Sequence, residues 1–450
     1  MSEAVSSLKR YFLDFLRVKS GLAGLVLLIV LLILTGVALS YPRSVYQAWN
    51  NPAAWSTYPA HVPPSWLSLF YPNEYFTTQT VQSSSIEYYQ LAQGVYVAYV
   101  TFNFTWDKPL PPTDVFFVVY TNTTPSSESV YWTKPDGESI TLNVPSQSYN
   151  VPFNVIPLKD QLLSYISSST GSTPSLVNAQ KLTASLFGYP QSNFTKVEDG
   201  RYSVKVVVVS SKPFKITGAE LKLLGNSYGL MGTDYFGRPV DLGVLLGLPS
   251  ALEIGVLTSV VSVVTGVVVG GISGYLGGRK DSVIQWVVLV FLALPALPFL
   301  VAVSIVTQPT LELEALLIAF LSWPFYAIIA RSVALSIKAN SYVEAEKLLG
   351  IPSYRIFFTH FMPRLIPMTV AYMALGVPAG VILSQTLAFL GLQPANVVTW
   401  GDMLNAAEAN QAQVNGWWWW VVFPGLMIVV VSVPFVLIGF AIERLVLGER

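Results

Sequence analysis

Six long apolar segments constrain the fold of this 450-residue chain more than any other feature of its sequence. A helix needs about 20 apolar residues to cross the hydrocarbon core of a bilayer, and each segment reaches that length. One such segment alone also fits a buried core helix. Six of them, in a chain with only 11% charged residues, favour a polytopic α-helical membrane protein with six transmembrane helices. The segments are 21–41, 254–276, 283–307, 315–337, about 365–392 and about 417–442.

Lysine and arginine residues orient the predicted helices, because positively charged short loops stay in the cytoplasm. Thirteen of these residues flank one set of helix ends, whereas the connections 308–314 and 393–416 on the other side contain none. This asymmetry predicts that both termini are cytoplasmic, with a segment 1–20 before the first helix. No convincing cleavage site precedes Pro42, so we interpret the first helix as a retained anchor. The expected location is the cell membrane, with multiple passes.

The composition excludes several classes of function. The formal net charge is zero and no basic block stands out, so we expect no binding to nucleic acid. The chain has no cysteine and only His61 and His360, which argues against thiol catalysis and against a metal site. It also lacks a GxxxxGK[ST] loop, so any ATP hydrolysis must come from another subunit. We therefore predict no catalytic residue and no cofactor in this chain.

Residues 42–246 separate the first two predicted helices and are numerous enough to form a domain of their own. Runs rich in β-branched and aromatic residues predict strands at 95–106, 115–120 and 202–210. Two stretches, about 158–169 and 175–187, are predicted helices. The topology places this mainly β domain outside the cytoplasm.

Three N-x-[ST] sequences occur in the predicted outer domain, at Asn103, Asn122 and Asn193. They are candidates for glycosylation, although chance explains such motifs equally well in a sequence rich in serine and threonine. Used sites would favour an archaeal cell surface. The many tryptophans and tyrosines of this domain fit core packing better than a platform for sugar rings.

The cytoplasmic connection 339–364 contains a short predicted helix from Tyr342 to Leu349. Ser341 and Glu344 have the spacing of a capping box, and Gly350 followed by Pro352 marks the end of the helix. An apolar face formed by Tyr342, Ala345, Leu348 and Leu349 must dock on something, because a helix of this length is unstable alone. It packs on its own bundle or fits the groove of a partner protein.

The residues of this connection resemble the EAA loop of ABC-importer permeases, which couples those subunits to their ATPases. The similarity comprises Glu344-Ala345-Glu346, Gly350 and, further on, His360-Phe361-Met362-Pro363. Glu346 replaces the second alanine of the pattern and Met362 its leucine; His360 departs from the general pattern but occurs in the peptide-permease branch. The resemblance implies an ATPase-coupling site made of the following residues: Tyr342, Glu344, Ala345, Leu348, Gly350, His360 and Pro363.

Other motifs resemble the dipeptide and oligopeptide branch of the same family. They are Gly232-Thr-Asp-Tyr-Phe-Gly-Arg238, the segment 384–394, Trp400-Gly-Asp-Met-Leu404 and Phe423-Pro-Gly425. The similarity covers roughly half of the chain, and the large outer domain replaces what is usually a short linker. It implies a second homologous permease, two ATPase subunits that bind ATP and Mg²⁺, and an extracytoplasmic substrate-binding protein. Archaeal members also import oligosaccharides, so both peptides and oligosaccharides remain open as cargo.

Few polar side chains occur within the predicted helices. Gln285, Ser384 and Gln385 are the best candidates for lining a translocation path. We expect no carboxylate relay of the kind that proton-coupled carriers use. Prolines within the helices fit either gating kinks or static packing. The alternative to a permease is a membrane receptor or sensor whose outer domain binds ligand.

Overall fold

The computed structural model describes residues 14–92, 94–122, 127–144, 158–171 and 179–447. It divides into two compact units, an outer unit formed by Asn51–Asp241 and a helical unit formed by Met1–Asn50 with Leu242–Arg450. The sequence predicted the limits of the outer domain at 42 and 246. The helix α3 (Arg43–Trp49), however, packs with the helical unit, where the Trp49 side chain lies against Gly243.

The outer unit is built on two antiparallel sheets. One sheet has the strand order β2-β3-β7-β5-β6, and the other has the order β1-β8-β4. The strands are β1 (Gln79–Gln82), β2 (Ser85–Ala92), β3 (Val95–Trp106), β4 (Val115–Thr121), β5 (Ser127–Thr133), β6 (Ser139–Val144), β7 (Gly200–Ser210) and β8 (Ile216–Leu223). Two helices, α5 (Lys159–Thr170) and α6 (Ala179–Phe187), accompany the sheets, and the short helix α4 covers Leu67–Phe70. The three predicted strands and both predicted helices are confirmed within the described residues.

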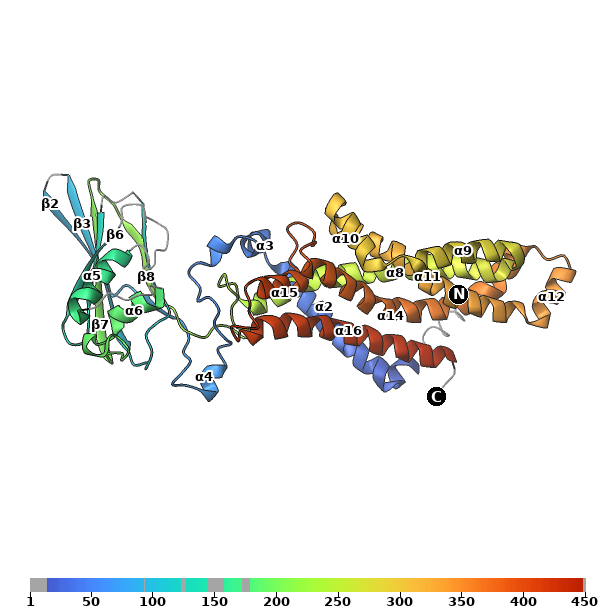
Figure 1. The fold of residues 1–450 in the computed structure, drawn as a ribbon, viewed down its shortest axis with the longest axis horizontal. Coiled ribbons are helices and arrows are strands. Elements are labelled where there is room, and N and C mark those ends of the chain that lie inside the picture. Colours follow the sequence, from blue (N-terminus) through green and yellow to red (C-terminus); the bar gives the residue numbers. More distant parts are fainter. Residues whose placement is uncertain (1–13, 93, 123–126, 145–157, 172–178, 448–450) are drawn as a thin grey trace, which may run out of the picture. The chain divides into compact units, whose positions relative to one another are not determined.

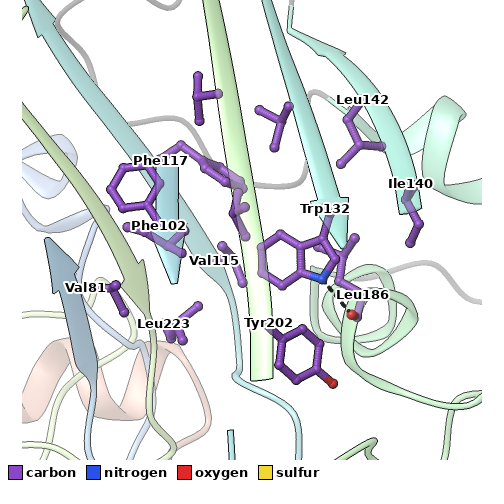
Figure 2. Packing of buried hydrophobic residues seen from close by; sticks show 14 of the residues in the cluster. Val81, Phe102, Val115, Phe117, Trp132, Ile140, Leu142, Leu186, Tyr202 and Leu223 are labelled. Atoms are coloured by element: carbon purple, nitrogen blue, oxygen red, sulfur yellow. Dashed lines mark hydrogen bonds between the residues drawn. The ribbon is translucent and has the colours of Figure 1, made fainter. Parts of the chain in front are cut away.

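Alternating residues of the strands form one apolar core in the outer unit (Figure 2). In β5 and β6, every second side chain points inward, as expected for a sheet with one buried face. Trp132 lies fully buried at the centre and donates its indole N–H to the Leu186 carbonyl oxygen at 2.9 Å. Phe104 and Tyr202 stack beside it, with ring centroids 5.4 Å apart. The core therefore favours packing as the role of these aromatic residues.

The helical unit contains the long helices α2 (Lys19–Ser40), α8 (Leu248–Leu276), α11 (Leu311–Lys338), α14 (Met362–Phe389) and α16 (Trp418–Leu447) (Figure 1). Shorter helices are α7 (Val240–Leu246), α9 (Gly278–Ala293), α10 (Ala296–Thr307), α12 (Ser341–Leu348), α13 (Ser353–Ile356) and α15 (Trp400–Ala409). Between α13 and α14, residues Phe357–Phe361 form one π-helical turn, η4.

Glycines allow α8 to approach α11 closely. A side chain at Gly270 would collide with the carbonyl oxygen of Ala327, and one at Gly266 would collide with the carbonyl oxygen of Trp323. Close backbone contact of this kind is how helices associate in lipid, where apolar side chains gain nothing from leaving the solvent. The two helices run parallel, because Thr258 contacts Ala315 near their starts and Lys338 contacts Leu276 at their ends.

Further contacts bring the positively charged connections together at one end of the bundle. Gly271 of α8 lies against Leu365 near the start of α14, so these two helices are antiparallel. Gly21 of α2 lies against Ala441 of α16, and Gly439 of α16 contacts Leu375 and Ala371 in the first half of α14. Lys19, Arg279, Lys280, Lys338, Arg364 and Arg444 therefore share this end of the helical unit.

The third predicted transmembrane helix is broken. The apolar run 283–307 predicted one continuous helix, but α9 ends at Ala293 and α10 begins at Ala296 with a bend of 75°. Pro295 accounts for the break, since it cannot donate a backbone hydrogen bond and holds the preceding Leu294 in an extended conformation. The described residues thus contain five helices long enough to cross a membrane, or six if the bent pair counts as one.

Candidate functional site

The helix α12 ends in a glycine motif, as its sequence predicts. Gly350 has a left-handed backbone (φ +78°), and its N–H donates to the Lys347 carbonyl oxygen at 3.1 Å. The N–H of Ile351 donates to the Glu346 carbonyl oxygen, also at 3.1 Å. These two bonds define a Schellman motif, which glycine favours because a side chain would strain the left-handed residue.

The predicted capping box at the start of α12 is wrong. Asn340, not Ser341, is the N-cap residue, and no side chain caps the helix. The Asn340 amide instead donates to the carbonyl oxygens of Ser336 and Ile337, at 3.0 and 2.9 Å, and so satisfies the end of α11. With its start one residue earlier, α12 covers Ser341–Leu348 where the sequence predicted 342–349.

One face of α12 fastens it to the bundle. Val343 is fully buried among Ile337 of α11, Ile356 of α13 and Phe361 of η4. Next to it on the same face, Tyr342 packs on His360 with ring centroids 5.1 Å apart. The sequence predicted one apolar face formed by Tyr342, Ala345 and the two leucines. In the structure, however, Tyr342 points towards the bundle and away from the exposed leucines. Val343, which was not predicted to belong to this face, is the buried apolar residue that attaches α12 to the bundle.

Polar contacts on the same inner face extend this attachment. The Nε2 atom of His360 lies 2.8 and 2.9 Å from the two carboxylate oxygens of Glu346. The Lys347 ammonium lies 5.4 Å from the ring centroid of Tyr275 on α8. The inner face of α12, which we define as Tyr342, Val343, Glu346 and Lys347, therefore contacts α8, α11 and η4.

The outer face of α12, which we define as Glu344, Ala345, Leu348 and the adjoining Leu349, is exposed. Leu348 and Leu349 are 84% and 79% exposed, and the exposed Glu344 lies one helical turn before Leu348. A fixed helix with two exposed leucines and a charged rim is suited to the groove of a partner protein. Of the remaining predicted coupling residues, Gly350 forms the turn and Pro363 is exposed at the start of α14.

Ser384 and Gln385, two predicted path residues, lie on α14 and are almost fully buried. The Gln385 side-chain oxygen accepts a hydrogen bond of 2.8 Å from the N–H of Gly401 on α15. The neighbouring Trp400 is fully buried and donates its indole N–H to the Val244 carbonyl oxygen at 2.9 Å. These contacts attach α15 firmly to α14 and α7.

Gln285, the third predicted path residue, belongs to a different cluster. Its amide donates to the Ser273 hydroxyl at 2.9 Å, and Ser273 donates to Asp281. Asp281 in turn accepts two hydrogen bonds, of 2.7 and 2.6 Å, from the Arg331 guanidinium. This network joins α8, α9 and α11, and it explains how Arg331 is tolerated near the end of an apolar helix.

Glu314 is a buried carboxyl that sequence analysis overlooked. It lies in the first turn of α11, only 1% exposed, beside the Ser384 hydroxyl but without a hydrogen bond of ordinary geometry to it. An acidic residue is favourable at a helix N-terminus, which hides the signal that it is also buried. Its burial arises from contacts of α11 with α10 and α14 that no local pattern reveals.

The motif that begins at Gly232 builds a compact turn in the outer unit. Asp234 accepts backbone N–H bonds from Phe236 and Arg238, at 2.9 and 2.8 Å, and pairs with the Arg238 guanidinium at 2.5 Å. Burial raises the pKa of the Asp234 carboxyl, while Arg238 opposes that rise. The Thr233 hydroxyl donates a hydrogen bond to the Pro59 carbonyl oxygen. These contacts stabilise the turn, which is a structural role for the motif.

The three candidate glycosylation residues are exposed. Asn103 lies in the middle of β3, and the Asn122 side chain accepts a 2.7 Å hydrogen bond from the N–H of Lys215. Asn193 follows a short 3₁₀ helix in a left-handed conformation (φ +51°). The threonine of the second motif, Thr124, lies outside the described residues.

Comparison with known proteins shows which family the helical unit resembles. Residues 266–447 match the model of the binding-protein-dependent transport system inner membrane component. The chain is 31% identical over 217 residues to the probable D,D-dipeptide transport system permease protein of Escherichia coli, a match that covers 48% of this chain and 71% of that protein. The chain belongs to this permease family.

Two further relatives carry the same kind of name. A dipeptide transport system permease protein of Bacillus subtilis is 30% identical over 213 residues, which cover 47% of this chain and 66% of that protein. An oligopeptide transport system permease protein of Haemophilus influenzae is 28% identical over 213 residues, which cover 47% of this chain and 68% of that protein. The resemblance predicted from the motifs is therefore confirmed, and the receptor alternative is not favoured. These relatives lend no support to an oligosaccharide cargo or to an archaeal source.

Proposed function

We propose that this chain is one of two homologous membrane subunits of an ATP-driven importer for short peptides. Family membership supports the role of a permease, and the names of the three relatives above support a peptide cargo. An extracytoplasmic binding protein delivers the peptide, and two ATPase subunits bind ATP and Mg²⁺. This chain itself contributes half of the path and one coupling helix.

The two faces of α12 carry this proposal. Its inner face is fixed by Val343 and the Glu346–His360 contact, and its outer face presents Leu348 and Leu349 to a partner. An ATPase groove that receives this face can move the bundle only if it binds one conformation of the permease more tightly than the other. ATP binding and hydrolysis then shift the bundle between states that open to opposite sides.

The orientation follows from charge. The lysines and arginines gathered at one end of the bundle support a cytoplasmic position for that end, for α12 and for both termini. Residues 42–246 then lie outside, where Asn103, Asn122 and Asn193 are accessible to glycosylation. We keep two roles for the outer unit, a docking platform for the binding protein and a module that contacts the peptide itself.

Ser384 and Gln385 are proposed to line the path in a conformation other than the one described, since both are buried here. Gln285 is proposed to reach the path when the Ser273–Asp281 network opens. Movement of α10 is the simplest route to exposing Ser384, because the break before Pro295 leaves α10 without a continuous helical link to α9.

Co-purification with the ATPase subunits tests the coupling role. The double variant Leu348→Asp, Leu349→Asp places two charges on the outer face of α12 and should abolish retention of the ATPases. Leu69→Asp is the matched control, because Leu69 is 81% exposed on α4 of the outer unit. Equal retention by the double variant and the wild-type chain would refute docking through α12.

Uptake by the reconstituted transporter tests the cargo. Labelled trialanine should enter proteoliposomes in an ATP-dependent manner, whereas labelled maltotriose should not. Uptake of maltotriose alone would replace the peptide by an oligosaccharide and leave the coupling role intact.

A further inference from the structure

Glu346 and His360, two residues that differ from the general pattern of the coupling loop, contact each other. The His360 Nε2 atom lies within hydrogen-bonding distance of both Glu346 carboxylate oxygens, at 2.8 and 2.9 Å. An ionised carboxylate only accepts hydrogen bonds, so this ring nitrogen carries the hydrogen. The two side chains are 24% and 27% exposed, which shields the contact partly from water.

The position of His360 gives this contact its importance. His360 belongs to the π-helical turn η4, which joins α13 to the long helix α14. The Tyr342 ring packs on its imidazole, and the Arg364 guanidinium lies 5.7 Å from that tyrosine ring. Glu346 and Tyr342 are four residues apart and lie on the same face of α12. They therefore hold the imidazole from two consecutive helical turns.

An apolar anchor and a hydrogen-bonded pair constrain a helix differently. Burial of Val343 keeps α12 against the bundle, but apolar contact is non-directional and leaves the tilt of the helix weakly determined. The Glu346–His360 contact is directional and acts one turn away from Val343. It fixes α12 relative to η4, at a turn whose hydrogen-bond pattern differs from that of the flanking helix.

We propose that Glu346 and His360 are positioning residues that make α12 and the base of α14 move as one body. Force applied by an ATPase to the outer face of α12 then reaches α14, which carries Ser384 and Gln385 towards its other end. Without the pair, α12 tilts about Val343 and part of the movement is lost before it reaches the path. This inference rests on the proposed coupling role.

The test measures peptide uptake and ATP hydrolysis in the same proteoliposomes, which contain the complete transporter and labelled trialanine. Glu346→Met and His360→Phe keep similar bulk but cannot form the hydrogen bond, so each should lower the peptide transported per ATP hydrolysed by about threefold to tenfold, with unchanged retention of the ATPase subunits. The exchanged pair, Glu346→His with His360→Glu, should recover most of the loss because it restores the contact. Thr359→Ala, an exposed neighbour in η4, is the control and should leave the ratio unchanged.

The possible outcomes separate this inference from the proposed function. If the wild-type chain retains no ATPase, the proposed function fails. If it does retain the ATPases and transports trialanine, but both single variants match its transport ratio, the positioning role is refuted. Loss of ATPase retention or of folding in both variants would show a purely structural pair and overturn the inference as well. A loss of coupling that the exchanged pair does not recover would also contradict it.

Discussion

The two units of this protein treat large apolar side chains in opposite ways. In the outer unit, Val100, Trp132 and Val206 are fully buried between the layers of the fold. In the helical unit, Ile33 of α2 and Trp286 of α9 are 61% and 67% exposed. The sheets of the outer unit thus enclose a core that excludes water, whereas the helical unit exposes apolar side chains as expected for a lipid environment.

The surroundings of a buried ionisable side chain also differ between Lys134 of the outer unit and Glu314 of the helical unit. The outer unit buries Lys134 completely and surrounds its ammonium with the Gly188 carbonyl oxygen at 2.8 Å, the Tyr165 hydroxyl at 3.0 Å and the Glu198 carboxylate at 3.5 Å. In the helical unit, Glu314 is buried beside the Ser384 hydroxyl. Lys134 is thus compensated by three oxygen atoms, whereas neither carboxylate oxygen of Glu314 makes a hydrogen bond within the described residues.

Loss of a core aromatic residue should have the largest effect and should separate the two units most clearly. Trp132→Ala removes a fully buried indole and its hydrogen bond, so we expect the unfolding free energy of the outer unit to fall by about 3–5 kcal/mol. Trp286→Ala, at an exposed position of α9, should change stability by less than about 1 kcal/mol. Hydrogen exchange of β5 and β7 in the full chain, held in nanodiscs, measures the first effect. Equal protection in Trp132→Ala and wild type would refute a water-excluding core.

Removal of one buried charge sharpens the comparison. Lys134→Met leaves the Glu198 carboxyl buried without its cation and should destabilise the outer unit by about 3 kcal/mol. Glu314→Gln removes no ion pair and should alter the stability of the helical unit by less than about 1 kcal/mol. Thermal unfolding of each variant in nanodiscs checks both values. A larger loss in Glu314→Gln than in Lys134→Met would contradict the contrast.

The last prediction concerns the pH dependence of stability. Burial raises the pKa of Glu128, on the inward face of β5, to about 7. The folded outer unit then binds a proton more tightly than the unfolded chain, so its stability is highest below the ordinary carboxyl pKa and falls as pH rises towards 7. We expect Glu128 to account for about 3 kcal/mol of this fall between pH 4.5 and 8. The difference between wild type and Glu128→Gln in hydrogen exchange from pH 4.5 to 8 measures it, and a difference that is constant with pH would refute the assignment.

Much of the fold follows from local patterns. Uninterrupted apolar runs located the long helices, and runs rich in β-branched and aromatic residues located strands such as β3 and β7 in the outer unit. Gly350 was predictable as the end of α12 because only the local backbone determines a Schellman motif. The family motifs identified the loop that contains α12, including His360, without any structure.

Other features depend on contacts between distant segments and were therefore missed. The N-cap of α12 is Asn340 and not Ser341, and the Asn340 side-chain amide donates hydrogen bonds to carbonyl oxygens at the end of α11. Val343 becomes the anchor of α12 only once α11, α13 and η4 surround it. Likewise, Glu346 was seen only as a departure from the pattern; its partner His360 lies fourteen residues further along the chain. The bend at Pro295 was too large to infer from proline alone.

Cross-linking at the outer face of α12 tests the central claim most directly. The natural chain contains no cysteine, so Leu349→Cys provides a single labelled position that is 79% exposed. A photoactivatable cross-linker attached there, in the complete transporter, should label an ATPase subunit, and its yield should change when ATP is added. The same probe at Val414→Cys, in the exposed connection between α15 and α16, should not label it. Labelling of the ATPase from Val414 and not from Leu349 would contradict the account.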